Sequence, residues 1–109
     1  MVIEYLEKIR DKYQENKYEI HTELTAVLNR QKENREIIKL LEINDDPNFE
    51  SFTPRQVNSF NKTKISELKE EQKELEVQIE ELNLKMESVN KDIEEVTSVI
   101  RYAKEQYKV

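Results

Sequence analysis

The sequence predicts an all-α protein: one long antiparallel helical hairpin of the coiled-coil type that assembles into a dimeric helical bundle. The 109 residues contain no Gly and only two Pro, so the chain has few of the residues that tight turns need. Charged residues make up 39% of the chain, beside many good helix formers. Apolar residues recur at regular intervals, which argues against disorder, the other state that high charge favours.

Both prolines fall in one short polar break, which reads as a loop. We therefore expect a single domain over residues 1–109, with a helix over 2–43, a loop over 44–53 and a second helix over 54–107. A loop this short makes the two helices antiparallel neighbours.

The start of the second helix carries several independent signals. Thr53 is a favoured N-cap residue, and Pro54 falls at the first helical position, where its missing N–H costs nothing. Gln56 completes a capping box with Thr53. Phe52 and Val57 have the spacing of a hydrophobic staple.

The second helix carries a nearly unbroken heptad repeat, which predicts a left-handed coiled coil. With Ile65 as position a, only Gln72 is polar before the C-terminal end. The a and d residues are Ile65, Leu68, Gln72, Leu75, Ile79, Leu82, Met86, Val89, Ile93, Val96, Ile100, Ala103 and Tyr107.

The first helix has a weaker heptad repeat, interrupted by Arg10, Lys17, Gln31 and Asn34. The series is Ile3, Leu6, Arg10, Tyr13, Lys17, Ile20, Leu24, Val27, Gln31, Asn34, Ile38 and Leu41. Three flanking apolar residues, Ile9, Leu28 and Ile37, widen the stripe. A wide stripe suits a helix with more than one neighbour, which favours a hairpin inside a larger bundle.

The lengths of the two helices predict how they align. Aligned at the loop, Gln31 lies opposite Gln72 as a polar pair that fixes the alignment. The second helix then extends past the first by roughly three turns, from about Val96 onward. Apolar residues on that overhang, such as Tyr102, need a partner, and a second copy of the chain supplies one by twofold symmetry.

We therefore expect a homodimer whose interface is formed by the helix 2 core, the overhang and the loop tip. The expected interface residues are Ile79, Leu82, Met86, Val89, Ile93, Val96, Val99, Ile100, Tyr102 and Phe49.

Charge and hydropathy restrict the other partners. The net charge is −6 and the basic residues form no stripe, so we expect no direct binding of nucleic acid. The sequence has no secretory signal pattern and no run of about 20 apolar residues, so we expect no membrane span and a cytoplasmic protein.

Nothing in the sequence indicates an enzyme, a cofactor or a metal site. There is no Ser/His/Asp or Cys/His set, and a phosphate loop would need Gly. Acid pairs such as Glu80-Glu81 are typical of the solvated face of a coiled coil. The single histidine, His21, is either a phospho-accepting or pH-sensing group or a flanking residue at an e position, and the second reading fits the helix better.

Five tyrosines occur in the chain, and the hairpin places Tyr5 near Val99 and Tyr102. Two interpretations remain open. The tyrosines either form an aromatic docking surface at the open end of the hairpin or fill the core with their hydroxyls in solvent.

The loop resembles the N-terminal cytosolic sensor region of DegS-type sensor histidine kinases. The matching residues are Asn48, Phe49, Phe52 and Thr53, followed by the heptad helix from Ile65. The resemblance implies the dimeric sensor segment of a two-component system, which passes a conformational signal along its helices. The sequence departs from that family in lacking a kinase domain and a phosphorylation helix, and its second helix is about one heptad short.

The function predicted from these features is a non-enzymatic coiled-coil module for protein–protein interaction. Two alternatives are a small acidic inhibitor of the phage type, which occupies a basic groove on an enzyme, and an assembly chaperone that holds an amphipathic helix.

Overall fold

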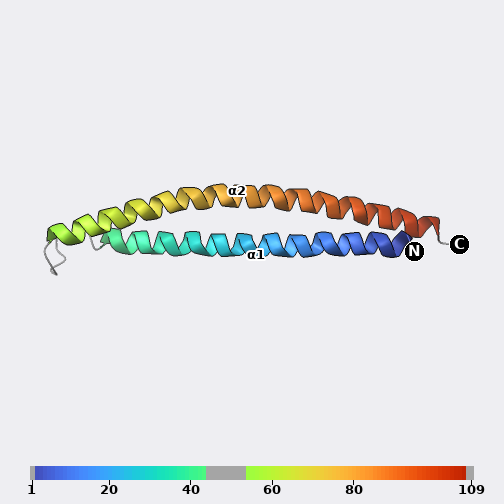
Figure 1. The fold of residues 1–109 in the computed structure, drawn as a ribbon, viewed down its shortest axis with the longest axis horizontal. Coiled ribbons are helices and arrows are strands. Elements are labelled where there is room, and N and C mark those ends of the chain that lie inside the picture. Colours follow the sequence, from blue (N-terminus) through green and yellow to red (C-terminus); the bar gives the residue numbers. More distant parts are fainter. Residues whose placement is uncertain (1, 44–53, 108–109) are drawn as a thin grey trace. The chain divides into compact units, whose positions relative to one another are not determined.

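The computed structural model describes residues 2–43 and 54–107. It contains two helices, α1 (Val2–Ile43) and α2 (Pro54–Gln106), and confirms the all-α helical hairpin (Figure 1). Helix α2 begins at Pro54, the residue that the capping pattern indicates. The cap residue Thr53, the staple residue Phe52 and the loop residue Phe49 lie outside the described residues. Neither described helix has a stretch apolar enough to cross a membrane.

The chain divides into two compact units, each of which contains part of both helices. Unit 1 comprises Met1–Thr25 and Glu80–Val109, and unit 2 comprises Ala26–Ile79. Unit 1 therefore joins two segments that are distant in the sequence, whereas unit 2 is one continuous stretch that contains the end of α1 and the start of α2.

The buried side chains follow the predicted heptads in both helices. With Ile3 as position a of α1, every residue in the α1 series except the charged Lys17 is buried or half-buried. In α2 the same holds for every residue in the series up to Ala103. The buried apolar residues are Ile20, Leu75, Leu82, Val89, Val96 and Ile100.

Unit 1 is an antiparallel pair, because the start of α1 lies beside the end of α2. Lys104 Nζ lies 3.6 Å from Glu7 Oε1. Both residues occupy e positions. In an antiparallel coiled coil the e positions of both helices line one side of the seam and the g positions line the other, so the Glu7–Lys104 pair identifies the e side of unit 1.

Unit 2 is antiparallel as well. Lys69 Nζ lies 4.0 Å from Glu42 Oε1, which again joins two e positions. On the g side, Arg30 Nε donates a hydrogen bond of 2.8 Å to Glu71 Oε1. The two e–e pairs of the chain are 35 residues, or five heptads, apart on each helix, so both units keep the same alignment.

The predicted overhang at the end of α2 is wrong. Val96 and Ile100 are buried in unit 1, and Lys104 reaches Glu7 of α1. The extra length of α2 lies at its beginning: Asn61 Nδ2 donates to Leu41 O at 3.5 Å, while α2 starts seven residues before Asn61 and α1 ends two residues after Leu41. Contacts between side chains, rather than the ends at the loop, set the alignment.

Tyr107 was predicted in the core and is 70% exposed, so that prediction is also wrong. The residue follows Gln106, the last residue of α2, and no turn of α1 covers it.

Two leucines of unit 1 give a matched test of the heptad assignment. Leu82 at position d is 6% exposed, and Leu84 at position f is 66% exposed. We expect Leu82→Ala to lower the free energy of unfolding by about 2–5 kcal/mol, because it leaves a cavity in the core. We expect Leu84→Ala to change it by less than about 0.5 kcal/mol. Urea unfolding followed by circular dichroism measures both, and equal losses would contradict the assignment.

Candidate interaction surfaces

A polar layer lies between the helices of unit 2. Gln72 Nε2 donates a hydrogen bond of 3.2 Å to the backbone oxygen of Gln31, so the two residues lie close together, but the contact is to the backbone of Gln31 and not to its side chain. Asn34 is 2% exposed, the most buried side chain in the described chain, and lies one helical turn from Gln31. We define the polar layer as Gln31, Asn34 and Gln72, with the Arg30–Glu71 ion pair at its edge.

Two polar atoms of this layer have no hydrogen-bond partner. They are Asn34 Nδ2, a donor, and Gln72 Oε1, an acceptor. An unsatisfied buried polar atom costs about 1–3 kcal/mol, so the layer lowers stability. Buried polar residues of this kind are known to select one alignment of a coiled coil, because every other alignment would pair them with apolar side chains.

The ion pair at the edge of the layer changes the ionisation of Glu71. The hydrogen bond from Arg30 lowers the pKa of the Glu71 carboxyl below its usual value of 4.5. Partial burial opposes this effect. The Asn34 amide also lowers the pKa of the Glu71 carboxyl, although Asn34 Nδ2 has no hydrogen-bond partner of good geometry.

Gln31 and Gln72 were predicted at the seam, whereas the Arg30–Glu71 pair and the burial of Asn34 and Asn61 were not predicted. A signal for the pairs was present. Opposite charges occur at matching e positions, Glu7 with Lys104 and Glu42 with Lys69, at equal spacing on both helices. Only one alignment satisfies both.

The residues predicted for the dimer interface occupy three different environments. Leu82, Val89, Val96 and Ile100 are buried inside the hairpin, and Ile79, Met86 and Ile93 are half-buried. Val99 and Tyr102 are exposed. Phe49 lies outside the described residues. The role of these residues in an interface stays a prediction, and the exposed pair is the part that a partner can reach without opening the hairpin.

The start of α1 and the end of α2 lie side by side at the open end of unit 1 (Figure 1), and several large apolar side chains occur there. Val2, Ile9 and Val99 occupy g positions, so they lie on the side opposite the Glu7–Lys104 pair. Tyr5 and Tyr102 occupy the neighbouring c positions and are 66% and 64% exposed. We call these five residues the open-end patch. The core-filling interpretation is wrong for both tyrosines.

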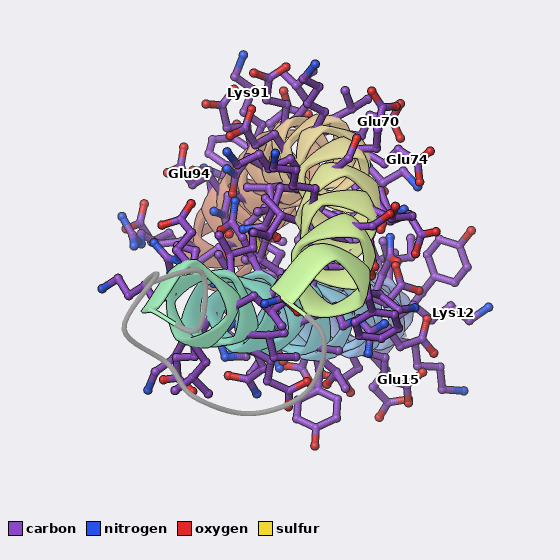
Figure 2. All side chains as sticks on the ribbon, turned by 90° about the vertical axis from the view of Figure 1, so that its left-hand side faces the viewer. Lys12, Glu15, Glu70, Glu74, Lys91 and Glu94 are labelled. Atoms are coloured by element: carbon purple, nitrogen blue, oxygen red, sulfur yellow. The ribbon has the colours of Figure 1, made fainter. Side chains whose placement is uncertain are left out.

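One strip of the α2 surface in unit 2 is acidic. Glu67, Glu70, Glu71 and Glu74 border a shallow hollow over Leu75. Glu70 and Glu74 project together from α2 (Figure 2). Across residues 2–43 and 54–107, no three His, Asp or Glu side chains are placed to hold a metal ion.

His21 is exposed on α1, and its backbone oxygen accepts a hydrogen bond of 2.9 Å from Thr25 Oγ1. The side chain therefore occupies the flanking position expected for an e residue.

No family model, curated protein or solved structure matches the chain. The loop residues that resemble DegS-type sensor regions, Asn48, Phe49, Phe52 and Thr53, lie outside the described residues.

The pKa of Glu71 leads to a pH-dependent prediction. A carboxyl whose pKa is lowered by folding contributes stability that is present above its unfolded pKa and is lost as the pH falls through its folded pKa. We expect Glu71→Gln to lower the urea midpoint at pH 7, and its difference from the unmodified chain to shrink below pH 4.5. The control is Glu70→Gln, whose carboxylate forms no ion pair in the described ranges. An identical pH dependence for both variants would refute the assignment.

Removal of the polar layer should stabilise the folded hairpin. We expect the double variant Asn34→Leu, Gln72→Leu to raise the free energy of unfolding by about 1–3 kcal/mol, because two unsatisfied atoms leave the core. We also expect it to lose its single alignment.

The alignment can be measured by spin labels at Lys39→Cys and Lys62→Cys in unit 2, since the chain has no other cysteine. We expect one distance in the parent and several in the double variant. A single, unchanged distance in the double variant would show that the layer does not select the alignment.

Proposed function

We propose that the chain is a non-enzymatic coiled-coil module for protein–protein interaction that works as a homodimer. The observation that carries this proposal is the open-end patch. All of its residues lie outside the a and d core of the hairpin, and all except the half-buried Ile9 are exposed.

The physical argument is the cost of leaving such side chains in water. Burial of apolar surface yields about 25 cal/mol per Å², and a tyrosine offers roughly 150–250 Å². Contiguous apolar patches on a highly charged surface mark interaction sites. Tyrosine suits such a site, because its ring is buried by the partner while its hydroxyl finds a polar neighbour.

A signalling role is the more specific form of the proposal. The loop resembles a dimeric sensor segment of two-component histidine kinases. The polar layer supports this role, because an alignment that is held by polar contacts at a cost in stability can be shifted by a modest force. In this proposal, a change in alignment of the two helices carries the signal.

The acidic surface of α2 supports a second candidate, an inhibitor that occupies a basic groove. The net charge of −6 and the glutamates around the hollow in unit 2 favour a basic partner. Such binding would weaken steeply with salt, since exposed charges are screened over about 8–10 Å at physiological ionic strength.

Light scattering across protein concentrations, with circular dichroism on the same samples, tests the proposal. We expect a highly helical dimer that dissociates on dilution and persists in 0.5 M salt, because its contacts are mainly apolar. A helical monomer at every concentration would refute the homodimer and favour the acidic inhibitor.

A further inference from the structure

We propose that the open-end patch is the dimer interface, and that it pairs with the same patch of a second copy so that α1 of each copy lies on α2 of the other. This inference rests on the proposed function and adds the surface, the residues and the symmetry of the dimer.

The patch is a continuous surface formed by both helices. The Glu7–Lys104 contact places the end of α2 beside the first turns of α1. Val99 lies five residues before Lys104, so it is level with the turn of α1 that contains Ile9. Tyr5 and Tyr102 lie on the same side of their helices as the g residues, because c and g positions are neighbours on a helix surface.

The apolar surface ends after about three turns of α1. Farther along the same side of unit 1, the surface hollow is bordered by Asn16, Glu23, Lys85 and Asp92, with Ile20 and Val89 beneath them. A partner that fits this side of unit 1 must therefore be apolar over a short length and polar beyond it.

The charges next to the patch favour a second copy as that partner. Lys12 follows Tyr5 by one heptad on α1, and Glu95 precedes Tyr102 by one heptad on α2, so each tyrosine is followed by a charge in the same direction along unit 1. Both side chains are exposed, and neither forms an ion pair within the described ranges. Lys12 projects away from the side that carries Glu94 (Figure 2).

A twofold axis parallel to the helices combines these features. It places α1 of one copy against α2 of the other, so that Tyr5 meets Tyr102 of the second copy and Ile9 meets Val99. One heptad farther, Lys12 meets Glu95. A twofold interface repeats each contact, which gives two tyrosine pairs and two ion pairs.

The other twofold arrangement has its axis perpendicular to the helices and stacks α1 on α1. Because α1 then lies on α1, Lys12 does not meet Glu95 of the second copy, and the two ion pairs are lost. The e side of unit 1 is less apolar than the g side. Arg10 and Lys17 occupy a positions of α1, which lie next to its e positions. The open-end patch has five residues, far fewer than the roughly 20–30 residues per partner of a standard interface, which predicts a reversible dimer.

Tyrosine variants of the full chain test the surface, with sedimentation equilibrium as the measurement. We expect Tyr5→Ser, Tyr102→Ser to weaken the dimer at least about 30-fold, as interface aromatic residues often do. Helicity should not change, because both side chains are exposed. The matched control is Tyr18→Ser, which removes a tyrosine that is 72% exposed at a b position of α1, and it should leave the dimer unchanged.

Charge reversal tests the symmetry. We expect Lys12→Glu or Glu95→Lys alone to weaken the dimer about 2- to 30-fold, since each change affects two contacts. The double variant Lys12→Glu, Glu95→Lys should restore the affinity. Additive losses in the double variant would overturn the α1-on-α2 arrangement.

The outcomes separate this inference from the proposed function. A parent chain that is monomeric throughout overturns both. A parent dimer that survives Tyr5→Ser, Tyr102→Ser as well as it survives Tyr18→Ser overturns the open-end patch alone. The half-buried a residues Met86 and Ile93 then become the surface to test for self-association.

Discussion

Two long helices whose apolar residues repeat every seven positions can pair in several alignments that differ by whole heptads. Each alignment buries a similar apolar surface, so the hydrophobic effect alone does not choose among them. In this protein the choice depends on polar contacts. The Arg30–Glu71 pair and the hydrogen bond from Gln72 to Gln31 fix unit 2, and the Glu7–Lys104 pair continues the same alignment in unit 1.

Unit 2 contains the buried polar residues that select the alignment, and unit 1 carries the proposed dimer surface. In unit 2 the core contains Asn34, Asn61 and Gln72, which specify the pairing at some cost in stability. In unit 1 the seam is mainly apolar, with Ile20, Leu82, Val89, Val96 and Ile100 buried. Unit 1, which has more buried apolar side chains, also carries the exposed tyrosines. The proposed dimer surface therefore lies on the unit with the larger apolar core.

The helices and their core could be predicted from the sequence because these features are local. Thr53 and Pro54 mark the start of α2 without reference to any distant residue, and the heptads identify Leu82 or Val96 as buried. The alignment was predicted only in part. Gln31 and Gln72 lie close together as expected, although Gln72 bonds to the backbone of Gln31, and the overhang expected after Val96 from the helix lengths is absent.

The open-end patch could be predicted only in outline, since it depends on that alignment. Proximity of Tyr5 to Tyr102 follows from any hairpin of these lengths. The exposure of the two tyrosines does not follow from the helix lengths, because a tyrosine at a c position can either fold over the seam or extend into solvent. Val99 occupies a g position. The e–e ion pairs are needed to show that the g residues of the two helices lie together on the other side of the seam.

Of the six buried apolar side chains in the described chain, only Ile20 belongs to α1, and the other five belong to α2. Helix α1 covers the seam largely with half-buried residues and already holds Arg10, Lys17, Gln31 and Asn34 at core positions. Replacements in α1 therefore cost less than equivalent replacements in α2. Over evolutionary time the first helix is free to diverge faster, and relatives of this protein should be recognisable mainly by their second helix.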